Sequence, residues 1–169
     1  SFDADAADLD EDDLVKGISD PAEQALALAR EKALHVAKRH PGRWVVGGDQ
    51  VGVLDDGTPL RKPADKDDQV AQLLEMARQP HRFFPAVALV KDGVVVDSAA
   101  DSVRVVFRAF DAATARAYVD SGEGAGSCGG YEIKHRGAQL IERVDGSLQA
   151  VLGFPLLLRA PGYHMGEHF

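Results

Sequence analysis

A turn signature between two apolar runs sets the strongest limit on what this chain can fold into. Asp92-Gly93 follows a strand predicted over Arg82–Val90 and precedes the apolar run Val94–Val96. This dipeptide suits the positive φ angles of a two-residue hairpin, so the two strands are expected to pair antiparallel. Pro85 is expected to break the first strand, because proline has no N–H for a ladder hydrogen bond. The pattern disfavours a plain doubly wound parallel sheet.

Further strand signals are spread along the chain. They lie at Trp44–Val46, at Val51–Leu54, at Tyr131–Ile133 and around Leu140-Ile141. The first of these is expected to be short and buried and to end at Gly47-Gly48. Ser102–Phe110 alternates apolar with basic side chains, which is the period of a half-buried strand.

Aspartate opens each of the main predicted helices. Asp20, followed by Pro21, has the pattern of an N-cap before the first helical turn. Asp65 and Asp111 begin two further helices, and a short terminal helix is expected near Leu156–Leu158. Helices mixed with hairpin-connected strands predict an α/β fold.

The composition narrows the class of protein. The chain has 169 residues, which favours a single domain over 1–169. Its 19 basic and 27 acidic residues give a net charge of −8, which argues against a nucleic-acid-coating surface. No apolar run approaches the length of a membrane span, and the only cysteine, Cys128, has no intrachain disulfide partner. We therefore expect a cytoplasmic protein without membrane or nucleic-acid partners.

Three local patterns have a plain structural interpretation. Residues 1–14 are strongly acidic and are typical of a solvated tail. Gly124–Gly129 matches G-x-G-x-x-G, but a dinucleotide fingerprint opens a helix, whereas a strand is expected here. His164–His168 matches H-x-x-E-H but contains Gly166 and follows Pro161-Gly162, so it lacks the helix that a zinc site of this kind needs.

Two lysines and two carboxylates form a stronger candidate site. Asp49 follows two glycines at an expected strand end, where turn capping is the alternative interpretation. Lys62 precedes Pro63, which holds it extended, and Lys32 lies on the first helix, where a solvated face is the alternative. With Glu11, these residues have the chemistry of a metal–triphosphate site. Carboxylates hold Mg²⁺ or Mn²⁺ and orient or deprotonate water, while lysines neutralise phosphate oxygens.

Several short motifs recur in a recognisable order. They are Asp10-Glu11, Ala29–Ala33, Val46–Val51, Arg61–Pro63, Tyr118-Val119, Gly129–Tyr131, Leu140–Gly146 and Val151–Leu156. Together they resemble the Maf family of nucleoside triphosphate pyrophosphatases, and the Asp49-Gln50 pair is similar to the branch that acts on 7-methyl-GTP. The resemblance implies a mixed sheet with flanking helices, related to inosine triphosphate pyrophosphatases. It also implies cleavage between the α- and β-phosphates.

The same resemblance implies roles for individual residues. Asp49 corresponds to the proton acceptor for the attacking water and, with Glu11, to a ligand of a divalent metal cation, Mg²⁺ or Mn²⁺. Lys32 and Lys62 correspond to phosphate-binding residues, and Gln50 to a residue that selects the base. The expected partner is a small-molecule nucleoside triphosphate. The oligomeric state stays open, with a homodimer among the options.

Two departures from the family pattern bear on activity and specificity. The family opens with a strand and a Ser/Arg-rich phosphate loop, and nothing before Ser1 supplies them, so the chain is expected to be either a fragment or trimmed product or a naturally short and impaired protein. The alternative function is a catalytically silent nucleotide-binding or regulatory protein. Lys134 stands where the 7-methyl-GTP branch has Glu, and His135 stands where glycine is usual. The Lys134 ammonium is expected to disfavour a cationic 7-methylguanine. Glu132 is expected to substitute only if the strand register shifts.

Overall fold

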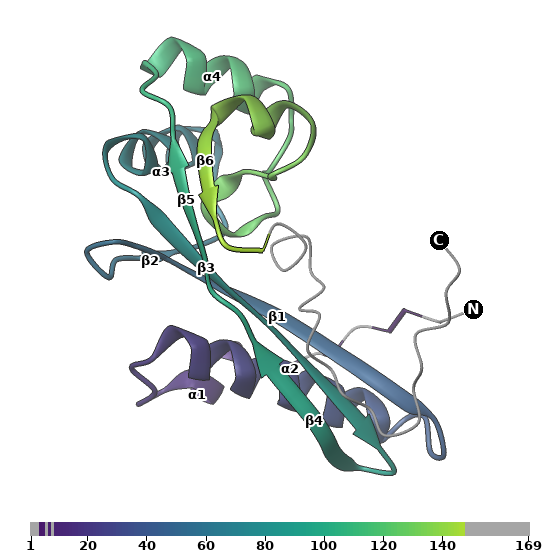
Figure 1. Ribbon diagram of the computed structural model, residues 1–169. Helices are drawn as coiled ribbons and strands as arrows, with labels where there is room; N and C mark the ends of the chain where they lie inside the picture. The colour runs from purple at the N-terminus through teal and green to yellow at the C-terminus, as the bar shows by residue number, and fades with distance from the viewer. Residues whose placement is uncertain (1–3, 6, 8, 148–169) are drawn as a thin grey trace, which may run out of the picture.

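The framework of the protein is one antiparallel sheet, seen in a computed structural model that describes residues 4–5, 7 and 9–147 (Figure 1). Its described strands are β1 (Trp44–Leu54), β2 (Pro59–Leu60), β3 (His81–Lys91), β4 (Val94–Ala100), β5 (Val103–Phe107) and β6 (Ile141–Asp145). The strand order is β2-β1-β3-β5-β6, and β4 pairs with β3. Each of these pairings is antiparallel. The expected α/β class with flanking helices and hairpins is confirmed.

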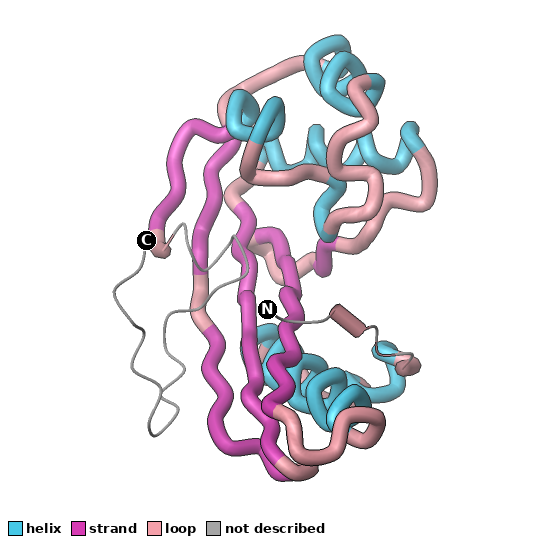
Figure 2. Tube along the Cα trace, turned by 90° about the vertical axis from the view of Figure 1, so that its right-hand side faces the viewer, coloured by secondary structure: helices cyan, strands magenta, loops and turns pink. Residues whose placement is uncertain are grey.

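Helices gather at the two ends of the long strands (Figure 2). The described helices are α1 (Glu11–Val15), α2 (Pro21–Ala37), α3 (Lys66–Arg78) and α4 (Ala112–Asp120), with the 3₁₀ helices η1 (Cys128–Gly130) and η2 (His135–Leu140). The predicted aspartate caps are confirmed, because Asp20, Asp65 and Asp111 each accept a hydrogen bond from a backbone N–H of the first turn. α2 lies along β1 and β3, whereas α3 and α4 contact each other at the opposite end.

Two apolar cores share the β1–β3 ladder. The core under α2 is built of small side chains, among them Ala25, Ala29, Ala33, Ala86, Ala88 and Val90. The core at the other end is built of larger ones, among them Leu73, Met76, Phe83, Phe107 and Tyr131. β1 and β3 pair without a break from Trp44↔Lys91 to Leu54↔His81. One continuous ladder therefore carries both cores.

The prediction that a short buried strand ends at Gly47-Gly48 is wrong. β1 continues through both glycines, and its outward side chains are open, with Trp44 52% and Val46 62% exposed. A Cβ on Gly47 would collide with the carbonyl oxygen of Ala29 and with Ala33 on α2. Gly47 therefore lets the helix approach the strand closely, which is a packing role and not a chain break.

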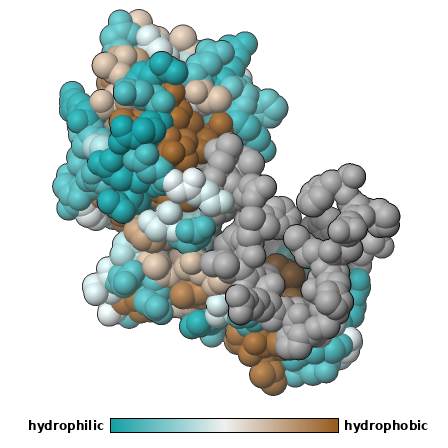
Figure 3. All heavy atoms as spheres, in the orientation of Figure 1, coloured by the Kyte–Doolittle hydropathy of each residue, from teal (hydrophilic) through white to brown (hydrophobic). Residues whose placement is uncertain are grey.

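β4, like β1, exposes large apolar side chains to solvent. Val94 is 63% and Val96 is 41% exposed. Figure 3 shows apolar surface at the lower tip of the molecule in that view, where the β3–β4 hairpin ends. Asp92 and Gly93 form the turn with φ angles of 51° and 77°, so the hairpin prediction is confirmed.

The prediction that Pro85 breaks its strand is also wrong. Pro85 lies fully buried within β3, opposite Gln50 of β1. The carbonyl oxygen of Pro85 accepts a hydrogen bond from Asp101 N at 2.9 Å. Because the N–H and C=O groups of a strand residue point to the same side, the missing N–H of Pro85 would also face Asp101. Along that side, β4 pairs with β3 from residue 86 onward and β5 pairs up to residue 83. The missing donor therefore falls between the two neighbouring strands and removes no ladder bond.

Two further expectations are corrected. The strand expected at Tyr131–Ile133 does not form, because positive φ angles at Gly129 and Gly130 turn the chain and the Tyr131 side chain enters the core. The acidic segment is not a solvated tail throughout, since Glu11–Val15 form α1. Asp5 also contacts Arg39, with 3.1 Å between Asp5 Oδ2 and Arg39 Nε.

Some expectations fall where the structure gives no description. The helix expected near Leu156–Leu158 and the motif His164–His168 lie outside the described residues. Within the described part of the chain, every helix is too short or too polar to cross a membrane.

Candidate active site

Three of the predicted site residues meet at one point between α1, α2 and β1. The ammonium of Lys32 lies 2.7 Å from Glu11 Oε1 and 2.6 Å from Asp49 Oδ2. The side chains of Lys32 and Asp49 are only 22% and 14% exposed. The alternative in which Lys32 occupies a solvated helix face is therefore excluded.

The two carboxylates keep Lys32 charged. Burial alone lowers the pKa of an amine, because the cation loses hydration. In Lys32 the contacts with Asp49 and Glu11 outweigh the effect of burial and raise the pKa above its ordinary value. Lys32 is therefore a fixed cation at neutral pH and is suited to hold an anion, not to accept a proton.

Asp49 lies in the middle of a strand. The expected position at a strand end is wrong, and turn capping is excluded, because β1 continues to Leu54. Asp49 Oδ1 accepts a hydrogen bond from Gln50 N at 2.7 Å. Asp49 Oδ2 is buried and contacts the Lys32 ammonium outside ideal hydrogen-bond geometry. Oδ1 is thus hydrogen-bonded to the backbone, whereas Oδ2 is held only by the charge of Lys32 and is the oxygen that can contact a ligand instead.

The edge of β1 is open beside Asp49 and Gln50. β2 pairs with β1 only at Gly52 and Val53, and no other described strand pairs with that edge. Neighbouring residues of a strand face opposite sides, so Asp49 faces α2 and Gln50 faces away from it. A ligand that lies across this edge can reach both side chains.

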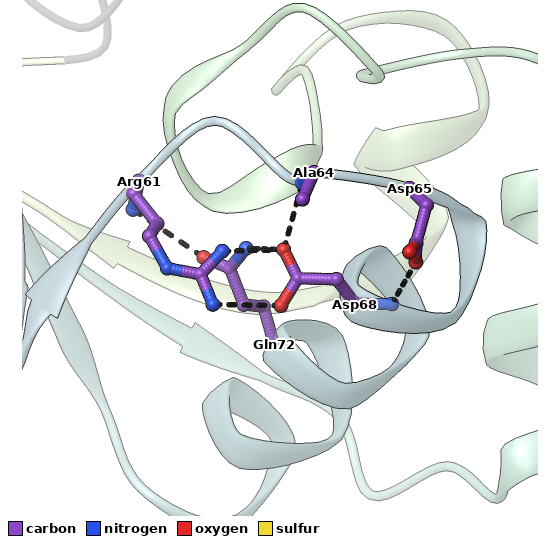
Figure 4. A network of polar contacts seen from close by, with 5 residues as sticks. All are labelled: Arg61, Ala64, Asp65, Asp68 and Gln72. Atoms are coloured by element: carbon purple, nitrogen blue, oxygen red, sulfur yellow. Dashed lines mark hydrogen bonds and ion pairs between the residues drawn. The ribbon is translucent and has the colours of Figure 1, made fainter.

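Lys62 lies in a loop that a polar network holds (Figure 4). Asp68 binds Arg61 through both carboxylate oxygens, with 2.8 Å between Arg61 Nη2 and Asp68 Oδ1. Asp68 also accepts from Ala64 N at 2.9 Å, and Asp68 N donates to Asp65 at 2.8 Å. The Arg61 guanidinium and the Ala64 N–H lower the pKa of Asp68 to about 2. The backbone on both sides of Lys62 is therefore fixed, while the lysine side chain is exposed to solvent.

A pocket of about 270 Å³ opens beside Gln50. Its other lining residues are Phe83, Ser127, Cys128, Tyr131, Glu132, Ile133 and Lys134. Burial raises the pKa of the Cys128 thiol to about 11, the charge of Asp49 adds to this shift, and Lys62 opposes it. The pocket wall therefore lies within electrostatic reach of both charges. Gln50 and Lys134, named from the family resemblance, line this one pocket.

Lys134 does not stand alone in this pocket. Its ammonium lies 3.5 Å from Glu132 Oε2, and the two side chains are 59% and 37% exposed. Glu132 reaches the pocket without the expected shift of strand register. The segment is not a strand, and residues two apart would share one face even of a strand. His135 has φ 54°, in the left-handed region that favours glycine, which fits the expectation of glycine there.

Sequence reasoning missed a buried histidine behind the pocket. His81 is fully buried, its Nε2 lies 2.7 Å from the hydroxyl oxygen of Tyr131, and its ring meets Phe107 edge-on at 4.8 Å. Burial lowers the pKa of His81 to about 3, against an opposing effect of Asp55. Its Nδ1 is buried without a partner, so a proton on Nε2 leaves only a lone pair unsatisfied. A single histidine at a strand start gives no sequence signal for this role.

Gln69 is a second missed residue. It is 2% exposed, and its Nε2 donates to the carbonyl oxygens of Glu123 at 2.9 Å and Gly130 at 2.7 Å. These bonds tether the glycine-rich loop to α3. Gln69 stands four and seven residues before Leu73 and Met76, on the buried face of the helix. That spacing was the signal that could have found it.

The two clustered carboxylates fit a divalent metal shared with substrate. Glu11 and Asp49 reach the same ammonium, so their oxygens converge. Mg²⁺ is usually bound by one or two carboxylates together with water and phosphate oxygens. In residues 4–5, 7 and 9–147, no group of three or more His, Cys, Asp or Glu side chains converges as an all-protein cage would require. Glu11 and Asp49 are the residues that could hold such an ion.

Comparison with known proteins relates this architecture to one family. Residues 1–160 match the family model described as Maf-like protein. A nucleoside triphosphate pyrophosphatase from Rhodopseudomonas palustris (strain HaA2) is 39% identical over 160 residues, which cover 92% of this chain and 79% of the relative. A nucleoside triphosphate pyrophosphatase from Sphingopyxis alaskensis is 34% identical over 175 residues, covering 96% and 87%. A dTTP/UTP pyrophosphatase from Deinococcus radiodurans is 38% identical over 140 residues, covering 83% and 71%.

Proposed function

This chain belongs to the Maf family, and from that premise we propose that it is a nucleoside triphosphate pyrophosphatase whose chemistry is centred on Asp49. The observation that carries the proposal is the contact of one ammonium, that of Lys32, with both Glu11 and Asp49. A half-buried cation between two carboxylates offers an anion-binding group, a metal-binding pair and a base at the same point.

In the proposed reaction, Asp49 accepts a proton from the attacking water. The water oxygen forms a new bond to phosphorus, and the bridging P–O bond between the α- and β-phosphates breaks. The products are a nucleoside monophosphate and pyrophosphate. Positioned proton transfer of this kind contributes on the order of 10²–10⁴ in rate.

Lys32 and Lys62 are proposed to bind the phosphates. Lys32 is a permanent cation beside the base, and Lys62 extends from a loop whose backbone is fixed by Asp68. The chain carries a net charge of −8, so a polyanionic substrate depends on such local cations. Their contribution is electrostatic stabilisation of charge that develops on phosphate oxygens.

A divalent cation, Mg²⁺ or Mn²⁺, is proposed to complete the site. Glu11 and Asp49 would hold it, and when bound it would neutralise phosphate charge. The chain's own residues then orient the water and the triphosphate around it.

The proposed substrate class is a modified guanosine triphosphate similar to 7-methyl-GTP. Gln50 beside Asp49 supports this choice through the family resemblance. The dTTP/UTP pyrophosphatase among the relatives makes pyrimidine triphosphates the necessary comparison.

The test is release of pyrophosphate from GTP, 7-methyl-GTP, dTTP and UTP with Mg²⁺, with Mn²⁺ and with EDTA. We expect pyrophosphate as the phosphate product, and only when metal is present. Release of orthophosphate, or full activity in EDTA, would contradict the proposal. Nucleotide binding without hydrolysis under every metal condition would favour the silent nucleotide-binding alternative.

A further inference from the structure

Glu132 and Lys134 place opposite charges side by side in the wall of the Gln50 pocket, 3.5 Å apart. We propose that this pair selects the base of the substrate by binding the Watson–Crick edge of guanine. The inference rests on the proposed function, since it concerns the base of a triphosphate cleaved at Asp49. Glu132 is the new specificity-determining residue.

The backbone at Glu132 is held firmly enough to orient its side chain. Glu132 N donates to the hydroxyl oxygen of Tyr118 at 3.2 Å. Its carbonyl oxygen is packed against Gly137, where any Cβ would collide with it. A carboxylate on a fixed backbone loses less freedom when a ligand binds, which favours selective recognition.

The ion pair leaves both groups able to bind a ligand. Charge-assisted hydrogen bonds between nitrogen and oxygen are about 2.7–2.9 Å long. The distance from Lys134 Nζ to Glu132 Oε2 is longer, at 3.5 Å, and both side chains are partly exposed. The carboxylate keeps free acceptor sites and the ammonium keeps free donors.

Guanine offers the complementary pattern. Its edge carries a carbonyl oxygen, O6, followed by two donors, N1–H and the 2-amino group. An ammonium donates to O6, while a carboxylate accepts from both donors. Adenine presents an amino group toward the ammonium and a bare nitrogen toward the carboxylate. Uracil has one N–H for the carboxylate and a second carbonyl that repels it.

The opposite charges of Glu132 and Lys134 also mean that the pair does not select for the charge of the base. The carboxylate and the ammonium cancel, so the pair adds no net attraction for a cationic base. Selection by this pair therefore follows the hydrogen-bond pattern of guanine, with or without a methyl group on its other ring.

The exocyclic amino group of guanine provides a direct test, because ITP differs from GTP only in lacking it. We expect wild-type protein to prefer GTP over ITP in kcat/KM by about 10-fold or more, which corresponds to one hydrogen bond to a charged group. In Glu132→Gln this ratio should fall close to one. Glu75→Gln is the matched control, since Glu75 also lies in an exposed ion pair, with Arg78 on α3. Equal use of GTP and ITP by wild type, or an unchanged ratio in Glu132→Gln, overturns the proposal.

A second variant tests the other half of the pair. Lys134→Met removes the donor to O6, so it should reduce the preference for ITP over ATP and leave the GTP/ITP ratio high. A loss of GTP/ITP discrimination in Lys134→Met, with the ITP/ATP ratio kept, contradicts the assignment.

Binding of GMP and IMP, measured by calorimetry without metal, separates this inference from the catalytic proposal. If no triphosphate yields pyrophosphate, the proposed function fails, yet tighter binding of GMP than IMP that depends on Glu132 still supports the base-reading pair. Equal binding of the two monophosphates contradicts the pair independently of activity.

Discussion

Lys32 Nζ lies 2.6 Å from Asp49 Oδ2, so a charge contact joins the long helix α2 to the middle of the neighbouring strand β1. This contact gives Asp49 a cationic neighbour that stays charged, because the pKa of Lys32 is raised once its carboxylate contacts outweigh the effect of burial. The contact therefore places a permanent positive charge directly beside the carboxylate that we propose as the base.

The first prediction concerns the proposed base. Asp49→Asn keeps the shape of the side chain but removes its basicity, and we expect turnover to fall by about 10²–10⁴-fold. Pyrophosphate release at saturating substrate and metal measures this change. Asp92→Asn, in the exposed β3–β4 turn, is the control and should retain activity. An active Asp49→Asn protein would return Asp49 to a structural role.

The second prediction concerns charge at the base pocket. Lys134→Glu replaces the ammonium near Glu132 with a second carboxylate, which attracts a cationic base. We expect the kcat/KM ratio of 7-methyl-GTP to GTP to rise about ten-fold, equivalent to roughly 1–2 kcal/mol. Wild type and variant should be compared at the same metal concentration. An unchanged or reversed ratio means that Lys134 does not face the base.

The third prediction concerns the loop that carries Lys62. Asp68→Asn weakens the paired contact with Arg61 and the bond from Ala64 N, so Lys62 should become less well positioned. We expect KM for the triphosphate to rise by about 3- to 10-fold with a smaller change in kcat. Asp67→Asn is a matched control on the same helical turn, where the side chain is 84% exposed. An equal change in KM in Asp68→Asn and Asp67→Asn would show that the Asp68 network does not position Lys62 for phosphate binding.

The fourth prediction concerns the pH dependence of folding. Burial lowers the pKa of His81 from 6.5 to about 3, so below the unfolded value the unfolded chain binds a proton that the folded chain does not. Stability should therefore fall as pH decreases through this window, by up to about 1.4 kcal/mol per pH unit. Chemical denaturation between pH 7 and about pH 4.5 measures the slope.

His81→Gln should flatten that slope, because glutamine is neutral and still offers an amide to the Tyr131 hydroxyl. His35→Gln on α2 is the control and should keep the wild-type slope. An equal slope in wild type and His81→Gln would assign the pH dependence to other groups.

The helices and the charged cluster were the parts best predicted from sequence. Caps at Asp20, Asp65 and Asp111 are local signals, since cap and first turn lie within three residues. Lys32 and Asp49 were named, but their contact depends on how closely α2 approaches β1 at Gly47, which no local pattern specifies.

Tertiary context explains the failures. Proline and paired glycines usually interrupt strands, yet Pro85 and Gly47-Gly48 lie inside long ones. Pro85 is tolerated because its neighbouring strands change at that position, and this depends on residues far along the chain. The pairing of Glu132 with Lys134 was missed although residues two apart lie on the same face even of the strand expected there.

The uninterrupted ladder between β1 and β3 has a consequence for motion. Both cores and the strand that carries Asp49 and Gln50 are attached to it, so a hinge between the two ends would have to break main-chain bonds. Substrate entry and release of two products then fall to side chains along the open edge of β1 and in the pocket beside Gln50. Rotamer changes of exposed side chains take picoseconds to nanoseconds, whereas domain rotation takes microseconds to milliseconds. Slow amide exchange along β1 and β3, both with and without bound nucleotide, is the measurement expected of a framework that does not bend during turnover.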